Sequence, residues 1–289
     1  MKENVIIATA LNKHVRIYLA NTKKLCEDAR VIHNLWPTSL AALGRTMSIT
    51  GIMALKQKEK DEVVTTTING GGPIGTIMVV AQSDGIVKGF VGDNEIYLKY
   101  NDSNKLAVGM AVGTNGYLKV TKNLKLKNNY TSQVKLQSGE IGDDFSYYFS
   151  VSEQVPSICS VGVLVDVDYT TKAAGALLIE LLPNHEEKDI LFLEELLKNL
   201  RPISSVLDED DDLEKYLYTL FNDAQILERR ELKYHCDCNR DRFLKGLLTL
   251  PKKDLLELLN EEEISIKCEF CNKEYKFNKN DIDLLSKYV

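Results

Sequence analysis

The sequence has no long uninterrupted run of hydrophobic residues. Its most apolar stretch, Ala173–Leu182, is broken by Glu180 and is shorter than the roughly 20 residues that a membrane-spanning helix requires. The apolar run near the start, Val5–Ala8, is likewise too short for the core of a signal peptide. We therefore expect neither membrane insertion nor export, and we expect a cytoplasmic location, where thiols stay reduced.

The sequence also lacks an excess of positive charge. The 289 residues carry a formal net charge of −6, which argues against general binding to nucleic acid through phosphate neutralisation. The negative charge is concentrated in residues 183–231, which hold 14 acidic and 6 basic residues. We therefore divide the chain into a main domain (1–182), an acidic connecting region (183–231) and a small terminal module (232–289).

Residues for catalysis are scarce. Ser152 lacks the G-x-S-x-G setting of a hydrolase nucleophile. The glycine-rich stretch 69–76 has Thr76 where a phosphate-binding loop requires lysine, so we predict a turn between strands there. The chain has only four histidines, and they form no triad or carboxylate dyad with neighbours in the sequence: His14, His33, His185 and His235. We therefore predict that the protein is not an enzyme.

The main domain combines helical and strand patterns without regular alternation. A helix capped by Thr22 is predicted to reach Trp36, and a second helix to run from about Thr38 to Gln57. The inward face of the second helix is expected to consist of Leu40, Leu43, Met47 and Ala54. β-Branched and aromatic runs predict strands at 63–68, 76–80, 86–91, 117–121 and 161–167, with a short helix at 143–152. These patterns indicate an α+β fold with antiparallel or mixed sheets and packed helices.

The connecting region has helical periodicity on both sides of an acidic run. Leucines recur at helical spacing in 190–200 and again in 213–221, and Asp208–Asp212 is five consecutive acids. Such amphipathic helices fold only when another surface covers their apolar faces. Two interpretations stay open: the helices simply pack on the main domain, or they are marginally stable and become exposed on demand.

Four cysteines near the C-terminus form the strongest chemical signal. Cys236 and Cys238 make one pair, and Cys268 and Cys271 make the other. Four thiolates in two close pairs are typical of a closed tetrahedral zinc site, which is structural because it has no open position. A disulfide framework and an iron–sulfur cluster are the alternatives, and His235 is interpreted as a bystander. Cys26 and Cys159 stand alone and are interpreted as packed apolar residues.

The terminal module is small for a self-sufficient domain. Its 58 residues have modest apolar content, and domains of this size usually need a metal or disulfides. Removal of the metal should therefore unfold it. Zinc-bound thiolates are also the form that oxidants attack, and a Cys-x-Cys disulfide is expected to be strained and easily reduced. The quartet therefore suits a reversible switch, while an inert zinc ribbon remains the alternative.

The cysteine arrangement and several other segments resemble the bacterial heat-shock protein thirty-three family, which are zinc-dependent, redox-regulated holdase chaperones. The similarity extends over nearly the whole chain. The segments that carry it are Ala41–Arg45, Asn69–Gly75, Tyr147–Phe149, Ser152–Pro156, Ala173–Gly175, Leu181–Pro183, Phe270–Cys271 and Tyr275–Phe277.

The resemblance implies a mechanism. The reduced, zinc-bound protein would be inactive, and oxidation would form Cys236–Cys238 and Cys268–Cys271 disulfides with release of the metal. The terminal module and the connecting region would then lose their order, and the exposed surface would bind unfolding client proteins without ATP during oxidative stress. The active form would be a homodimer. Acidic charge beside the apolar faces would keep that form soluble.

Two other functions fit the cysteine quartet less well. A zinc-ribbon module that binds nucleic acid or protein would use a purely structural zinc, but such nucleic-acid modules usually carry a basic surface and residues 232–289 have no net charge. An enzyme with a structural zinc would need catalytic residues that the sequence does not supply.

Overall fold

The computed structural model describes residues 4–103, 105–125, 128–247, 249–258, 263–278 and 281. The chain forms two compact units, Met1–Tyr234 and His235–Val289. The predicted connecting region lies inside the first unit, and its separation from a main domain at residue 182 stays a prediction. Among the described residues, no helix is long and apolar enough to cross a membrane.

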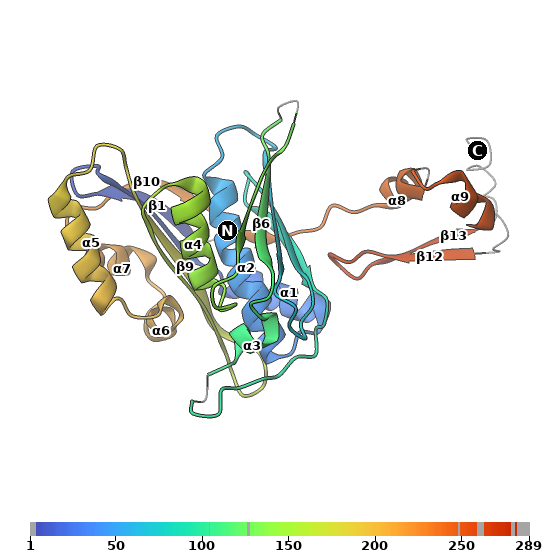
Figure 1. Ribbon diagram of the computed structural model, residues 1–289, viewed down its shortest axis with the longest axis horizontal. Coiled ribbons are helices and arrows are strands. Elements are labelled where there is room, and N and C mark those ends of the chain that lie inside the picture. Colours follow the sequence, from blue (N-terminus) through green and yellow to red (C-terminus); the bar gives the residue numbers. More distant parts are fainter. Residues whose placement is uncertain are drawn as a thin grey trace. The chain divides into compact units, whose positions relative to one another are not determined.

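The first unit contains a five-stranded sheet in the order β10-β1-β2-β9-β8, and all neighbouring strands are antiparallel (Figure 1). Its strands are β1 (Val5–Ala10), β2 (Val15–Asn21), β8 (Ser157–Val165), β9 (Thr171–Leu181) and β10 (Gln225–Arg230). Side chains alternate between the faces of a strand, and the central strands β1, β2 and β9 are buried on both faces. On β1, Val5 and Ile7 join one hydrophobic cluster, whereas Ile6 and Ala8 join a second.

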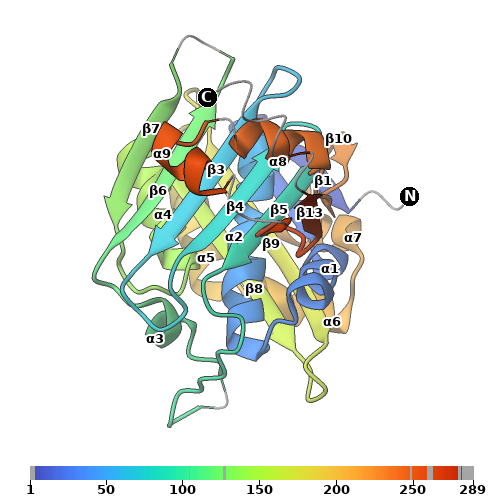
Figure 2. The ribbon, with the colours of Figure 1, turned by 90° about the vertical axis from the view of Figure 1, so that its right-hand side faces the viewer.

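A six-stranded sheet forms the other side of the first unit. Its order is β11-β5-β4-β3-β6-β7, and only β11 runs parallel to its neighbour. Its strands are β3 (Val63–Asn69), β4 (Ile77–Gln82), β5 (Ile86–Val91), β6 (Tyr117–Asn123), β7 (Tyr130–Lys135) and β11 (Lys233–Tyr234). Figure 2 shows the strands β3 to β7 side by side.

Helix α2 (Pro37–Leu55) lies between the two sheets and contacts strands of both. Every residue of α2 except Arg45 is buried, so the single inward face expected from the sequence was too narrow. Gly44 allows this close packing, because a Cβ there would lie 2.8 Å from Cys26 Sγ and 2.9 Å from Val163 Cγ2. The other helices of this part are α1 (Lys23–His33), α3 (Val108–Val112), α4 (Gly142–Tyr148) and the π-helical turn η1 (Phe149–Glu153).

The expected α+β class with antiparallel and mixed sheets is confirmed. The predicted strands are present, although the last one begins at Ser157 rather than Val161. Helix α1 ends at His33 because Asn34 adopts a left-handed conformation, so the prediction that it reaches Trp36 was wrong. Strands β1, β2 and β9 were missed because they are buried on both faces and show no alternation of polar and apolar residues.

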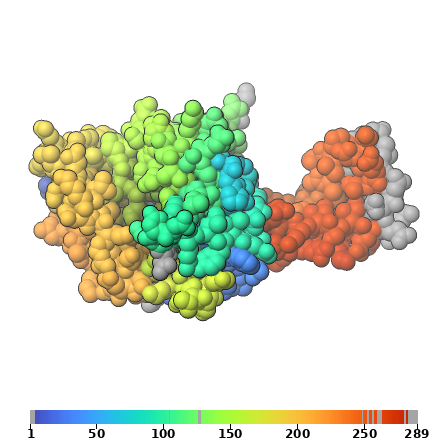
Figure 3. Space-filling view, turned by 60° about the horizontal axis from the view of Figure 1, so that its bottom comes forward, coloured from blue at the N-terminus to red at the C-terminus, as the bar shows by residue number. Residues whose placement is uncertain are grey.

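Three helices cover the outer face of the five-stranded sheet: α5 (Glu187–Asn199), α6 (Ile203–Glu209) and α7 (Leu213–Leu220). They appear in Figure 3 in yellow to light orange, gathered on one side of the first unit. Leu193, Leu207 and Leu217 pack into the second hydrophobic cluster. Helix α5 leaves part of its apolar surface uncovered, since Leu191 is 59% exposed and Leu197 is 55% exposed. We call α5–α7 the helical layer.

The acidic run inside the helical layer is partly neutralised. Asp208 pairs with Lys172 at 2.7 Å and Asp210 pairs with Lys215 at 2.7 Å. Asp212 caps α7 by accepting hydrogen bonds from two backbone amides. The sequence analysis predicted a break between helices at Asp208–Asp212 and did not predict α6. Helix α6 extends through Glu209, so the first two residues of the acidic run are helical. Exposed ion pairs of this kind contribute little stability, so the layer depends mainly on its apolar contacts.

The described residues of the second unit form helices and a hairpin. These are α8 (Arg240–Leu247), α9 (Lys252–Leu258), β12 (Glu263–Lys267) and β13 (Glu274–Asn278). The two strands pair antiparallel, with Ile264 opposite Phe277 and Ile266 opposite Tyr275. This hairpin positions half of the cysteine quartet.

We predict that a Glu27→Gln variant is less stable than the wild type at neutral pH. The expected loss is limited to about 1 kcal/mol, because solvent screens the interactions of a partly exposed carboxylate. Hydrogen bonds from Arg30 lower the pKa of Glu27 to about 2, and the Thr171 amide also donates to this carboxylate at 2.9 Å. A depressed pKa stabilises the fold above the unfolded-state value near 4.5, and this contribution is lost as the pH falls toward 2. Urea unfolding at pH 7 and pH 3, followed by fluorescence of Trp36, tests this. A difference that is equally large at pH 3 contradicts it.

Candidate metal centre

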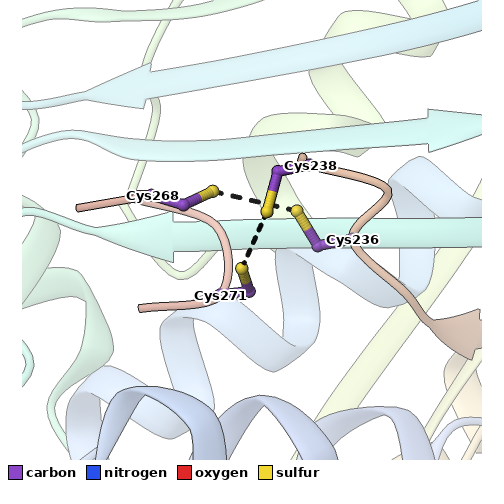
Figure 4. A group of neighbouring side chains, drawn as sticks. All are labelled: Cys236, Cys238, Cys268 and Cys271. Carbon is purple, nitrogen blue, oxygen red and sulfur yellow. Dashed lines mark hydrogen bonds between the residues drawn. The ribbon is translucent and has the colours of Figure 1, made fainter. Parts of the chain in front are cut away.

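The four clustered cysteines come from two backbone segments of the second unit (Figure 4). Cys236 and Cys238 lie in an extended stretch that ends where α8 begins at Arg240. Cys268 and Cys271 lie in the turn between β12 and β13. The spacing of the cysteines in the sequence groups them into two pairs, and the structure brings the two pairs together.

The hairpin turn is shaped by backbone hydrogen bonds to and from Cys268. Its amide donates to the Lys273 carbonyl at 2.9 Å, and its carbonyl accepts from the amides of Cys271 at 3.3 Å and Asn272 at 2.8 Å. Asn272 has a φ of 58°, a left-handed conformation that asparagine tolerates better than most residues. This turn directs both of its thiols toward the other pair.

The sulfur positions fit a tetrahedral metal site. All four Sγ atoms lie within 4.8 Å of one another. The Cys236 and Cys268 sulfurs are 3.8 Å apart, and the Cys238 and Cys271 sulfurs are 3.2 Å apart. Four zinc–sulfur bonds of about 2.3 Å at tetrahedral angles place neighbouring sulfurs about 3.8 Å apart. The donor set and its spacing therefore suit zinc, with small adjustments of the thiols.

Tyr275 is a further member of the site. Its hydroxyl donates to the Cys238 carbonyl at 2.9 Å and lies 3.1 Å from the Cys238 sulfur. Its ring stacks on Phe243 with the centroids 4.9 Å apart. The sequence analysis did not identify Tyr275 as a residue of the site. Its position two residues before the buried Phe277 on β13 indicated an inward-facing side chain and was the available signal.

The thiols do not ionise alike. Burial opposes ionisation of Cys238, but the Tyr275 hydroxyl and the other thiols of the quartet stabilise its thiolate and lower its pKa to about 7. Burial raises the pKa of Cys271. Hydrogen bonding to Cys238 raises the pKa of Tyr275 to about 12. A divalent cation at the centre is the kind of charge that allows all four sulfurs to be thiolates together.

Within the described part of the second unit, little apolar packing surrounds the site. Two side chains form the buried centre of the second unit's described core, Phe277 at 0% exposure and Leu247 at 8%. The residues around them are only partly buried: Phe243, Leu244, Leu258, Ile264, Ile266 and Tyr275. Leu248 and Leu259, which belong to the apolar content of residues 232–289, lie outside the residues that the structure describes.

The structure also locates His235, Cys26 and the glycine-rich stretch 69–76. His235 is exposed and does not belong to the cysteine group. Cys26 is fully buried in α1, and burial raises the pKa of its thiol to about 12, which confirms it as a packed residue. The glycine-rich stretch connects β3 to β4, as predicted, and its Gly72 and Ile74 amides donate to backbone carbonyls.

The chain matches known proteins along nearly its full length. The family model described as Hsp33 protein matches residues 3–278. A 33 kDa chaperonin of Alkaliphilus oremlandii is 41% identical over 99% of this chain and 96% of its own length. A 33 kDa chaperonin of Geobacillus kaustophilus is 39% identical over 99% of this chain and 98% of its own length.

The fold also matches a solved structure. The crystal structure of a 33 kDa chaperonin from Thermotoga maritima, described as a heat shock protein 33 homolog, superposes with a TM-score of 0.90. The two sequences are 34% identical, and the match covers 99% of each chain. The similarity therefore includes both the first unit and the cysteine-bearing second unit.

Proposed function

This chain belongs to the Hsp33 protein family of chaperones, and from that premise we propose that it is an ATP-independent holdase that oxidants activate through its cysteine quartet. It would act in the reducing cytoplasm, hold unfolding client proteins, and catalyse no reaction. The observation that carries the proposal is the gathering of four thiols, from two separate segments, within 4.8 Å of one another.

In the resting state, Cys236, Cys238, Cys268 and Cys271 would hold Zn²⁺, which would cross-link the two segments. Structural zinc sites of this type contribute about 10–16 kcal/mol of apparent binding free energy at neutral pH. That range exceeds the total stability of many domains, about 5–15 kcal/mol. In the part of the second unit that the structure describes, the buried core consists of Phe277 and Leu247, so the second unit would depend strongly on this cross-link.

Oxidation would convert metal-binding thiolates into disulfide sulfurs. A thiolate attacks peroxide, its sulfur becomes a sulfenic acid and hydroxide departs; a second thiol then displaces water and forms the disulfide. One peroxide is reduced to two waters for each disulfide, so the quartet consumes two. Cys236–Cys238 and Cys268–Cys271 are the pairs that family membership favours. All four sulfurs lie within 4.8 Å of one another, and an S–S bond is about 2.05 Å long, so the two sulfurs of each pair would move together when the disulfide forms.

The client-binding surface would lie beneath the helical layer. The outer face of the five-stranded sheet carries apolar side chains of β1, β2 and β9, and α5, α6 and α7 pack against them. The exposed leucines of α5 and the exposed ion pairs around α6 favour this layer as a part of the first unit that can be displaced. We further propose that two copies of the oxidised chain associate.

We expect hydrogen peroxide treatment of the zinc-loaded protein to release about one zinc per chain and to suppress aggregation of a heat-denatured client. Zinc is measured with a chromogenic chelator, free thiols by alkylation, and aggregation by light scattering. A thiol reductant with added zinc should reverse both effects. The matched control is a Cys159→Ser variant, which removes a thiol outside the quartet and should respond normally. Zinc release without any gain in client protection contradicts the proposal and favours a purely structural zinc.

A further inference from the structure

Residues 225–234, which we call the strap, connect the two sheets of the first unit. Its first part is β10, which pairs with β1 at the edge of the five-stranded sheet. Its last part is β11, which pairs with β5 at the edge of the six-stranded sheet. At the end of β10, the Arg230 side chain donates to the Ser83 carbonyl at 2.8 Å. The strap ends two residues before Cys236.

Leu232 anchors the strap in the first hydrophobic cluster and is only 2% exposed. Glycine makes room for it: a Cβ on Gly51 of α2 would lie 2.9 Å from both Leu232 methyl carbons. A second glycine admits the strap backbone, because a Cβ on Gly85 would lie 1.9 Å from the Glu231 carbonyl oxygen. The socket is therefore built for this segment in this position.

Polar contacts fix the backbone on both sides of the anchor. The Asn4 side chain accepts from the Leu232 amide at 2.8 Å and donates to the Leu232 carbonyl at 3.1 Å. The Lys233 amide donates to the Gly85 carbonyl at 3.0 Å. The Tyr234 hydroxyl donates to the Gly89 carbonyl at 2.9 Å.

The other end of the strap belongs to the helical layer. Phe221 and Ala224, which connect α7 to β10, are buried in the second hydrophobic cluster, and Ile226 packs against it. The Arg229 side chain also forms an ion pair with Glu214 of α7. A single ten-residue segment therefore has one end in each of the two hydrophobic clusters of the first unit.

We propose that the strap transmits the state of the cysteine module to the helical layer, and that the seating of Leu232 is the contact that decides whether the layer stays closed. This inference rests on the proposed function, because it names the route by which oxidation would uncover the client surface. It assigns regulation to residues that bind no metal and take part in no thiol chemistry.

The physical reason lies in the shortness of β11. It pairs with β5 through only two residues, and a strand of that length keeps its order only when both of its ends are held. When the module beyond Tyr234 is folded, the strap is an internal segment. When the module unfolds, the strap leads into a disordered tail, and terminal segments lose their order first. Withdrawal of Leu232 would then free β10 and, through it, α7.

The test is hydrogen exchange of the full-length, reduced and zinc-loaded chain, with Leu232→Ala and Gly51→Ala compared with the wild type. The first variant removes the anchor, and the second fills its socket while leaving the strap sequence intact. We expect amide protection in residues 187–220 to fall about 30-fold or more in both variants without oxidant. Zinc content and protection of residues 263–278 should stay at wild-type values.

Leu136→Ala is the matched control. Leu136 is a leucine of the same hydrophobic cluster with 6% exposure, and it follows β7 at the opposite edge of the six-stranded sheet. It should leave protection of 187–220 unchanged. Wild-type protection of these helices in Gly51→Ala, or an equal loss in Leu136→Ala, overturns the proposal.

A time course of the wild type under peroxide gives a second measurement that needs no variant. The strap should lose amide protection no later than residues 187–220; opening of the helices over a protected strap overturns the proposal. Client aggregation is recorded in parallel. Failure of the oxidised wild type to protect a client defeats the proposed function alone, because the exchange data for the reduced variants do not depend on it.

Discussion

A Cys268→Ser variant should lose nearly all bound zinc and all amide protection in residues 263–278, even in reducing buffer. Cys268 is the most buried of the four thiols, at 4% exposure, and its backbone organises the hairpin turn. A serine hydroxyl is a much poorer zinc ligand than a thiolate. Loss of this ligand removes much of a binding free energy of about 10–16 kcal/mol. The measurements are zinc stoichiometry and hydrogen exchange.

The described core of the second unit agrees with so large an effect. Among the described side chains of this apolar cluster, Phe277 and Leu247 are the buried ones, and full burial of such side chains contributes about 1.5–3 kcal/mol each. Cys159→Ser serves as the control, since it removes a thiol from the first unit and should leave zinc and hairpin protection unchanged. One zinc per chain and a fully protected hairpin in Cys268→Ser would refute the view that the metal holds this unit together.

A Leu217→Ala variant should protect clients in reducing buffer, before any oxidation. Leu217 lies on α7 with 0% exposure, in the hydrophobic cluster beneath the helical layer. Truncation of a buried leucine costs about 2–5 kcal/mol. We expect a layer of three short helices not to stay packed on the sheet after such a loss. Client light scattering and binding of an apolar fluorescent dye measure the outcome, with zinc content expected to stay normal.

Leu118→Ala separates this effect from general instability. Leu118 is equally buried but lies on β6, in the other hydrophobic cluster. It should lower the stability of the first unit, reported by Trp36 fluorescence, without giving client protection. If both variants protect clients equally in reducing buffer, the binding surface is not the one beneath α7.

The cysteine site was predictable because its ligands are local in sequence. Each pair needs only one or two intervening residues to turn its thiols in one direction, so the spacing alone indicated a four-sulfur site. Tyr275 was not identified as a partner of Cys238, because their hydrogen bond joins residues 37 positions apart. That contact depends on how the β12–β13 hairpin packs against the segment that carries Cys238. A local sequence pattern contains no information on such packing.

The fold class was predictable, but the layering was not. Strand β3 was recognised because it is a run of β-branched residues, Val63–Ile68, whereas β1 is buried along its whole length and shows no alternation. The turn from β1 to β2 also lacks glycine, although Leu11, Asn12 and Lys13 all have positive φ. Helix α6 was missed because its acidic end resembles a linker.

Burial of the five-stranded sheet on both faces determines how much of the molecule must come apart. Neighbouring residues of each central strand contribute to different clusters, so stripping the helices from one side leaves the contacts with α2 on the other side in place. A broad apolar surface would then be exposed to misfolding proteins while the rest of the first unit keeps its native fold. Return to the inactive form would require only that three helices pack again on a sheet that has kept its structure.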